Sequence, residues 1–352
     1  MSKEHKMKVG ISIGDLNGIG PEIILKTLED SRMLEFCTPV IFANIKLMSF
    51  YKKTANIQCN LQGVDNVDKI IPKKINVINV WKENVNVHFG KEEKEAGSYA
   101  LKSFQAAVSA LKEGKIDVLV TAPINKSNIQ SDSFTFPGHT DYLDQELKGD
   151  ALMLMISDTL RVGLLTDHVA VKDVPSKITR ELIERKINTI HKTLIQDFGI
   201  EKPKIAVLGI NPHNGDNGVI GNEDDTILRP TLDNLRNNGK VIFGPYAADS
   251  FFGSGNYKNF DVIIASYHDQ GLIPFKTLAF GSGVNFTAGL DQVRTSPDHG
   301  TAYDIAGKNK ANHDSFRAAL FNAISIYKAR KEYQKISENP LVLKRRQPFV
   351  KK

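Results

Sequence analysis

Residues 261–271 of the chain, Asp-Val-Ile-Ile-Ala-Ser-Tyr-His-Asp-Gln-Gly, join an apolar run directly to a polar cluster. The five apolar or small residues after Asp261 predict a strand that is buried on both faces, because such strands lack the alternation of polar and apolar side chains. In α/β folds the carboxyl ends of parallel strands open into the ligand-binding cleft. We therefore expect the polar cluster at 267–270 to lie in a cleft.

The same arrangement occurs at 161–168 and 204–213, so that three predicted strands are each followed by a histidine: His168, His213 and His268. A single histidine in such a place is more often structural than a ligand. Three imidazoles at strand ends instead indicate an open site for a divalent metal ion, with positions left for substrate. The histidines lie too far apart in the chain for a zinc-finger motif, so the fold would assemble the site.

The amino-acid composition is that of a globular protein: of the 352 residues, 41% are hydrophobic and 24% are charged. A chain of this length predicts two lobes around a cleft. The formal net charge is +6, and the last nine residues supply most of it, through Lys344, Arg345, Arg346, Lys351 and Lys352. The rest of the chain is nearly neutral, which argues against a nucleic-acid partner.

The cysteines and the apolar runs indicate the compartment. Cys37 and Cys59 lie outside every motif, which favours a reducing compartment over a disulfide framework. The N-terminal residues lack the apolar region of a signal peptide, and the longest apolar run, 151–156, has the length of a strand. We expect a cytoplasmic protein without a membrane partner.

The first predicted strand, 7–13, leads into Gly14-Asp15-Leu16-Asn17-Gly18-Ile19-Gly20-Pro21-Glu22. Its glycines allow a tight strand-to-helix turn, Pro21 suits the first helical position, and Glu22 complements the helix N-terminus. The spacing is not GxGxxG, which disfavours a Rossmann site. The turn is either structural or faces a ligand.

Hydrophobic periodicity predicts the other elements of an α/β fold. Helices are expected at 98–113, 177–198, 224–238 and 313–331, and further strands at 40–43, 75–80, 117–120 and 241–243. Lys126 follows the strand 117–120 and is a candidate for an anion contact. At 138–141 a turn precedes a helix, and there Thr140 is an N-cap candidate.

Polar residues gather again in the last third of the chain. Lys276, Asn285 and Arg294 combine a point charge, an amide and a guanidinium fork, as phosphate and carboxylate binding requires. At 298–308, glycines flank polar groups that can contact a nucleotide through backbone amides. Asp249, after the strand 241–243, either caps a helix or acts in the cleft.

Six motifs follow one another along the chain: Gly14-Asp15 with 18–22, Thr-Ala-Pro-Ile-Asn-Lys at 121–126, Gly-His-Thr at 138–140, Asn-Pro-His at 211–213, Tyr-His-Asp-Gln-Gly at 267–271, and Arg-Thr-Ser at 294–296 with Asp-His-Gly-Thr-Ala at 298–302. Together they resemble the 4-hydroxythreonine-4-phosphate dehydrogenase family of pyridoxal phosphate biosynthesis. The segment 298–308 also resembles the cofactor loop of isocitrate and isopropylmalate dehydrogenases.

The resemblance implies an α/β fold with a two-lobed α/β/α subunit of the isocitrate and isopropylmalate dehydrogenase type. One lobe would be 1–137 plus 290–352, with the NAD-binding loop, and the other 138–289, with the metal-ligand histidines and the dimer contacts. The active-site cleft would lie between the lobes and at the interface of a homodimer.

The resemblance also implies the ligands. The three histidines would hold one divalent ion per subunit, zinc, magnesium, cobalt or manganese. The substrate would contact His139, Thr140, Lys276, Asn285 and Arg294. NAD, or alternatively NADP, would contact Asp298, Gly300, Thr301, Asp304 and Gly307.

The implied reaction is the NAD-dependent oxidation of the C3 hydroxyl of 4-phosphooxy-L-threonine to a β-keto acid, which decarboxylates to 3-amino-2-oxopropyl phosphate. Asp249 and Asp269 are both candidates for the general base. The nearest alternative is a dehydrogenase of threonate or erythronate 4-phosphate. From another class, a zinc hydrolase would use the same histidines to activate water, but would leave the segment 298–308 without a ligand.

Overall fold

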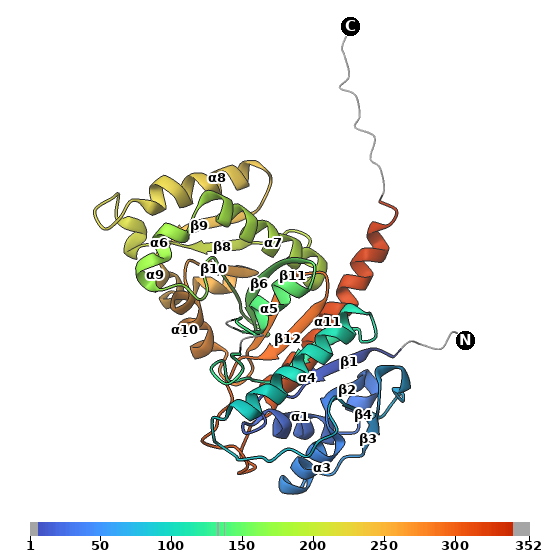
Figure 1. The fold of residues 1–352 in the computed structure, drawn as a ribbon. Coiled ribbons are helices and arrows are strands. Elements are labelled where there is room, and N and C mark those ends of the chain that lie inside the picture. The colour runs from blue at the N-terminus through green and yellow to red at the C-terminus, as the bar shows by residue number, and fades with distance from the viewer. Residues whose placement is uncertain (1–5, 132–133, 137, 341–352) are drawn as a thin grey trace.

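The computed structural model of the chain describes residues 6–131, 134–136 and 138–340. The basic residues at the C-terminus lie outside this part. Within it, twelve strands form one continuous sheet in the order β3-β4-β2-β1-β5-β12-β11-β6-β7-β10-β8-β9. Helices cover both faces of the sheet (Figure 1), so the fold has three layers, α/β/α.

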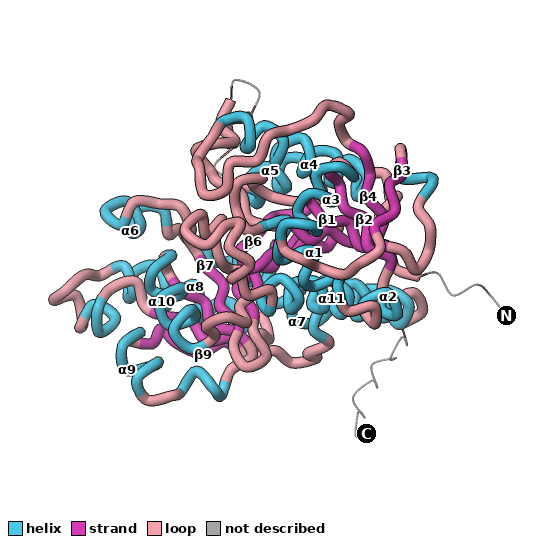
Figure 2. The backbone as a smooth tube through the Cα atoms, turned by 90° about the horizontal axis from the view of Figure 1, so that it is seen from below, coloured by secondary structure: helices cyan, strands magenta, loops and turns pink. Residues whose placement is uncertain are grey.

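The first half of the sheet is parallel throughout. Its strands are β1 (Lys8–Ser12), β2 (Thr38–Ala43), β3 (Leu61–Val64), β4 (Ile75–Asn79), β5 (Val118–Thr121) and β12 (Val293–Pro297). Most of their side chains are buried, because helices lie above and below them. Figure 2 shows the strands as one band that continues from this half into the other.

The second half is also parallel, in β7 (Arg161–Leu164), β8 (Ile205–Leu208), β9 (Ile242–Tyr246) and β10 (Val262–Ala265). Between the halves lie β6 (Gly149–Ile156) and β11 (Val284–Leu290), which pair antiparallel with each other and with their other neighbours. Three consecutive antiparallel pairings reverse the strand direction, so the two parallel halves run in opposite directions.

One face of the sheet packs against five helices that share a single apolar cluster. These are α1 (Gly20–Glu29), α3 (Ile45–Thr54), α7 (Arg180–Phe198), α8 (Arg229–Asn237) and α11 (Asp314–Ser337). Two separate clusters cover the other face. The first includes α4 (Lys94–Lys112) and α5 (His139–Glu146), and the second includes α9 (Ala248–Gly253) and α10 (His268–Leu278). The short helices α2 (Met33–Phe36) and α6 (Val174–Lys177) complete the set of α-helices in the described part.

Most predicted elements are confirmed, with shifted ends. Helix α4 begins at Lys94 rather than at 98, and the helix expected at 224–238 starts as a π-helical turn, Asp224–Leu228, before α8. Among the elements that the sequence pattern did not predict are α3, α10, β3, β11 and β12. The last two pair antiparallel with each other at the centre of the sheet.

The predicted fold class is confirmed as a mixed α/β fold with three layers. The division into lobes at 137/138 and 289/290 stays a prediction, although the change from β12 to β11 falls close to the second boundary. None of the helices in the described residues is both long and apolar enough to cross a bilayer.

Candidate active site

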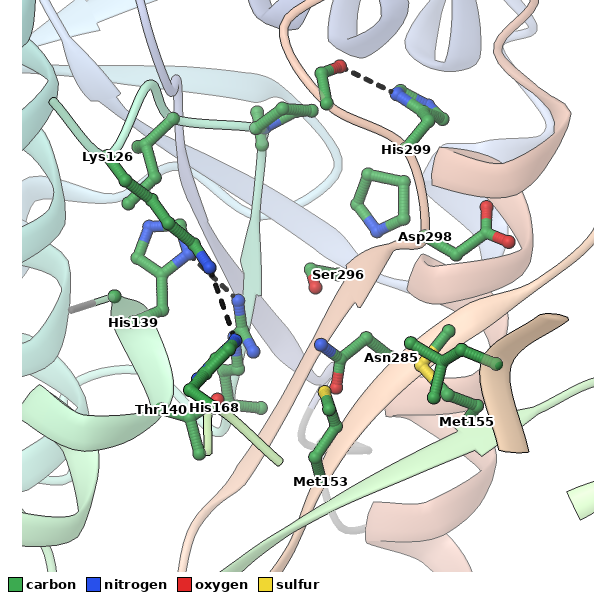
Figure 3. Close-up of a pocket in the computed structure, with 18 of the residues that line it drawn as sticks. Lys126, His139, Thr140, Met153, Met155, His168, Asn285, Ser296, Asp298 and His299 are labelled. Carbon is green, nitrogen blue, oxygen red and sulfur yellow. Dashed lines mark hydrogen bonds between the residues drawn. The ribbon is translucent and has the colours of Figure 1, made fainter. Parts of the chain in front are cut away.

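A cavity of about 320 Å³ lies over the antiparallel centre of the sheet, between α5 and α10. Its floor is formed by side chains that β6, β11 and β12 direct to this face, among them Met155, Asn285 and Arg294. Figure 3 shows Met155 and Asn285 together with side chains from the loops that follow β5, β7 and β12, among them Lys126, His168 and His299. Segments that are far apart in the sequence therefore meet in one place.

Arg294 is the most unusual group in the cavity wall, because its charge is buried and none of the described residues provides an acidic partner for it. The residue is only 2% exposed. Its guanidinium donates to Thr121 Oγ1 (2.5 and 3.1 Å), to Thr287 Oγ1 (3.1 Å) and to His139 Nδ1 (3.0 Å), which are all neutral acceptors. Burial lowers the pKa of Arg294 to about 9. A buried cation in such surroundings is prepared to bind an anionic ligand.

His139 lies at the start of α5 and packs against Phe104, with ring centroids 4.4 Å apart. Burial, together with the nearby charges of Arg294 and Lys126, holds the pKa of His139 well below its ordinary value. The imidazole is therefore neutral at physiological pH. Its Nε2 is buried and has no hydrogen-bond partner among the described residues.

Thr140, the next predicted substrate residue, also lines the cavity. Its predicted N-cap role is wrong, because Gly138 occupies the N-cap of α5 and Thr140 lies inside the first turn. Helix α5 begins two residues earlier than that prediction required. Thr140 therefore keeps its hydroxyl available for a ligand, with no role in capping.

Two further buried polar atoms in the cavity wall have no partner among the described residues, Asn285 Oδ1 and His299 Nε2. Unpaired buried polar atoms are rare in folded proteins because each loses its hydrogen bonds with water. With His139 Nε2 they make three such atoms around one cavity. Their concentration there indicates a site built for a polar ligand.

Two lysines add positive charge to the same cavity. Lys126 comes from the loop after β5, and Lys276 comes from α10, where its Nζ donates to the carbonyl oxygen of Asp298 (3.0 Å). The acidic residues Asp141 and Asp298 line the cavity as well. The cavity therefore holds three cationic side chains and two acidic ones, a set that suits a ligand carrying both signs of charge.

His168 and His268 also line the cavity, and their ring centroids are 6.2 Å apart. Lys126 Nζ lies 3.3 Å from His168 Nε2, so this nitrogen presents its lone pair, and burial followed by the charge of Lys126 lowers the pKa of His168. His268 Nδ1 donates to Asp269 Oδ1 (2.7 Å), which leaves the lone pair on His268 Nε2. Since Asp269 holds Nδ1 of His268 and Nε2 of His168 faces the cavity lysine, each ring can offer its Nε2 to a metal ion.

His213 does not line this cavity. It is exposed in a turn after β8, with a left-handed backbone (φ 52°). Within the described part of a single chain, no group of three or more histidine, cysteine, aspartate or glutamate side chains is placed to hold a metal ion. The structure therefore places two of the three predicted ligands together and leaves His213 apart from them, so the metal site stays a prediction.

The two general-base candidates also lie outside the cavity wall. Asp249 is exposed on α9. The side chain of Asp269 is 67% exposed, and its contact with His268 is suited to orienting that ring. Neither carboxylate is near enough in this chain to be assigned as a base, so both remain predictions.

The segment 298–308 begins at the cavity and leads away from it. Asp298 and Gly300 line the cavity, whereas Thr301, Asp304 and Gly307 lie beyond it. Among the described residues, the backbone amides at 300–304 donate no hydrogen bond. Consecutive free amides attract phosphate groups, so the segment fits the pyrophosphate of a dinucleotide.

Some residues of the cavity wall were not predicted as ligands, namely Asp141, Met153, Met155, Ser296 and His299. Asp141 and His299 directly adjoin the predicted motifs, so their polar side chains were a usable signal. Met153 and Met155 are two positions apart in an apolar run, so in a strand their side chains point to the same face. Which face borders a cavity depends on the helices above it.

A family model described as "Pyridoxal phosphate biosynthetic protein PdxA" matches residues 35–323. The chain is 47% identical over 341 residues to 4-hydroxythreonine-4-phosphate dehydrogenase of Bacteroides thetaiotaomicron, covering 96% of this chain and 94% of the relative. It is 36% identical over 317 residues to D-threonate 4-phosphate dehydrogenase of Cupriavidus necator, covering 89% and 95%. The crystal structure of 4-hydroxythreonine-4-phosphate dehydrogenase from Klebsiella pneumoniae superposes with a TM-score of 0.79 at 31% identity, covering 93% and 99%.

Proposed function

The chain belongs to the PdxA family of pyridoxal phosphate biosynthetic proteins, and we propose that it oxidises the C3 hydroxyl of 4-phosphooxy-L-threonine with NAD as hydride acceptor. Members of this family are oxidoreductases, so the resemblance noted in the sequence holds. The alternative of a zinc hydrolase has no support in the comparisons. The roles of individual residues are part of the proposal.

The observation that carries the proposal is the buried guanidinium of Arg294, whose partners in the described part of the chain are all neutral. A phosphate or carboxylate of the substrate would provide the missing negative charge. Lys126 and Lys276 in the same cavity provide for a second anionic group. A substrate that carries both a phosphate and a carboxylate matches this distribution, whereas an unphosphorylated hydroxy acid leaves buried positive charge unpaired.

The remaining polar groups would orient the substrate. The neutral ring of His139 accepts from Arg294 at Nδ1, so it carries its proton on Nε2 and can donate to a substrate oxygen. Thr140 and Asn285 add a hydroxyl and an amide. Asp141 and Asp298 complement an ammonium group, which 4-phosphooxy-threonine carries and threonate 4-phosphate lacks.

His168, His213 and His268 would together hold one divalent ion, of zinc, magnesium, cobalt or manganese. Such an ion acts as a Lewis acid toward the oxygen of the reacting alcohol. In one chain only His168 and His268 lie together, so we propose a homodimer in which His213 comes from a second copy of the chain. Asp269 would hold the ring of His268 in position.

The segment 298–308 would bind NAD, or NADP, with its free amides near the pyrophosphate. Hydride would pass from C3 of the substrate to the nicotinamide, and the hydroxyl proton would leave to a base. The product is a β-keto acid, and the new ketone accepts the electrons of the carbon–carbon bond when CO₂ leaves. The final product would be 3-amino-2-oxopropyl phosphate.

The proposal is tested by the formation of NADH with 4-phosphooxy-L-threonine and with unphosphorylated 4-hydroxy-L-threonine, under the same metal. We expect turnover to depend on the phosphate. Equal kcat/KM for the two compounds would contradict the roles given to the cationic side chains. A parallel assay with D-threonate and D-erythronate 4-phosphates covers the second candidate function, which the similarity to the Cupriavidus necator relative supports. Faster turnover of either compound would move the assignment to that activity.

A further inference from the structure

Asp15 is a fully buried carboxylate, 0% exposed, that the proposed reaction does not use. One of its oxygens, Oδ1, accepts from the backbone amide of Asn17 (2.9 Å). The other, Oδ2, accepts from Tyr303 Oη (2.9 Å) and from Asn128 Nδ2 (3.2 Å). No cation pairs with this carboxylate among the described residues. Such a group is costly to bury, so its neighbours must compensate it.

The three side chains form a closed triangle, because Asn128 Nδ2 also donates to Tyr303 Oη (3.1 Å). Tyr303 therefore accepts from Asn128 and donates to Asp15. Burial, followed by the charge of Asp15, raises the pKa of Tyr303, which keeps its hydroxyl protonated as a donor. Burial likewise raises the pKa of Asp15. Every hydrogen bond in the triangle has a defined direction.

The triangle joins three segments that are distant in sequence. Asp15 lies in the turn before α1, Asn128 in the loop after β5, and Tyr303 in the segment 298–308. Backbone contacts reinforce the same junction. Ile19 N donates to the carbonyl oxygen of Thr301 (3.0 Å), and a Cβ on Gly18 would come within 2.9 Å of that oxygen.

We infer that Asp15, Asn128 and Tyr303 form a latch that positions the segment 298–308 for the dinucleotide. The free amides at 300–304 come immediately before and around the latched Tyr303. Free amides attract a pyrophosphate well only if they are held in one arrangement, because a mobile segment must first be ordered at a cost in entropy. The turn at Gly14-Asp15 thus acts on the cofactor from a distance, as the anchor of its binding segment.

This inference rests on the proposed function, since it takes NAD to be the ligand of the segment 298–308. Its main test is Tyr303→Phe, which removes one oxygen and keeps the ring. Asp15→Asn is the second variant, because it removes the charge and keeps the shape. The matched control is Tyr327→Phe, since Tyr327 donates to Asp117 Oδ1 (3.0 Å) in an equivalent tyrosine–aspartate pair just before β5, outside the cavity wall.

The dissociation constant of NAD⁺ is measured by calorimetry on the full chain, and that of the phosphorylated substrate separately. We expect Tyr303→Phe and Asp15→Asn to weaken NAD⁺ binding roughly tenfold and to change substrate binding by less than about twofold. The KM for NAD should rise in the same proportion, with little change in the KM for substrate. Amide hydrogen exchange at 299–308 should become faster in Tyr303→Phe but not in Tyr327→Phe.

Unchanged NAD⁺ affinity in both latch variants would overturn the inference. A parallel loss of NAD⁺ and substrate affinity would also overturn it, because that pattern indicates a general structural defect. Failure of the proposed function has a different signature. In that case the wild-type chain would neither bind NAD⁺ nor form NADH, whereas hydrogen exchange would still report whether Tyr303 holds the segment.

Discussion

Arg294 Nη2 lies 3.0 Å from His139 Nδ1, which joins β12 to the first turn of α5 inside the cavity. Arginine can only donate, so the imidazole accepts at Nδ1 and carries its proton on Nε2. One contact thus fixes the tautomer of the histidine. It leaves the buried guanidinium paired with neutral atoms and leaves Nε2–H without a partner among the described residues. The substrate is expected to satisfy both.

Replacing the buried cation should separate activity from stability. In Arg294→Met the side chain keeps its bulk but loses its charge. We expect kcat/KM for the phosphorylated substrate to fall about ten- to a hundred-fold, the loss of roughly 1.5 to 3 kcal/mol for a charge-assisted contact. The melting temperature of the protein without substrate should not fall, because an unpaired buried charge is removed.

Arg330→Met is the matched control for this experiment. Arg330 is also buried, but it pairs with the buried carboxylate of Asp197 (2.7 Å) on α7, away from the cavity. Loss of the guanidinium leaves the buried carboxylate of Asp197 without its cation, which lowers the free energy of unfolding by about 3 to 5 kcal/mol. We expect a lower melting temperature with little change in kcat/KM of the folded enzyme. A stable Arg330→Met together with an unfolded Arg294→Met would contradict these assignments.

We expect the purified protein to contain one divalent metal ion per chain. Elemental mass spectrometry measures this metal content. Single replacements of His168, His213 or His268 by alanine should each lower the metal content and the activity, whereas His191→Ala on α7 should change neither. Loss of one ligand from three typically weakens a metal site by orders of magnitude. If a variant with all three histidines replaced by alanine kept its normal metal content, these histidines would not be the metal ligands.

Mixed dimers test whether the site is shared between chains. A His168→Ala chain and a His213→Ala chain are each expected to be inactive alone. When they are refolded together, activity should return, because one site of the heterodimer would contain all three histidines. A second mixture, of His168→Ala with His268→Ala, asks whether these two neighbours also act across the interface. Full activity of wild-type monomers would contradict the shared site.

Asp269→Asn distinguishes an orienting carboxylate from a general base. An orienting role, through the 2.7 Å contact with His268 Nδ1, predicts metal binding that is about 10- to 100-fold weaker and activity that returns with excess metal. A general base predicts low kcat at every metal concentration, with a changed pH profile. We expect the first result. Asp249→Asn on α9 serves as the comparison, and a loss of kcat at saturating metal in either variant would identify the base.

Stability should depend on pH through His139. Its pKa in the folded protein is lowered below the ordinary value of 6.5, first by burial and then by Arg294 and Lys126. Below pH 6.5 the unfolded chain therefore binds more protons than the folded chain, and the free energy of unfolding falls as the pH falls toward the folded pKa. Urea unfolding between about pH 8 and about pH 5.5 should show this slope. His139→Gln should flatten it, and equal slopes would contradict the burial of a neutral ring.

The local hydrophobic pattern was sufficient to predict the strands that precede the three histidines. The apolar runs that became β7, β8 and β10 are continuous because helices cover both faces of the sheet, and burial of that kind is visible in composition alone. The polar residues after each run were correctly placed beyond the strand ends. The ordered motifs were also sufficient to identify the family.

The contacts between residues that are far apart in the chain could not be predicted from this local pattern. The pattern at β11 and β12 is short and partly polar, and its strand character depends on pairing with β6 and with each other. Those antiparallel pairings reverse the second half of the sheet. They bring Arg294 to His139, 155 residues earlier in the chain, and the fold brings Tyr303 to Asp15 across 288 residues.

The sequence by itself determined which residue types were available for chemistry: histidines after buried strands, cations and an amide in the last third of the chain, and glycines that flank polar groups at 298–308. Only the tertiary structure decided which of them meet. It placed His168 beside His268 and left His213 outside the cavity, and it surrounded Arg294 with neutral partners. The physical reason is that burial is encoded locally by apolar periodicity, whereas the distance between two side chains depends on strand order and direction across the whole sheet.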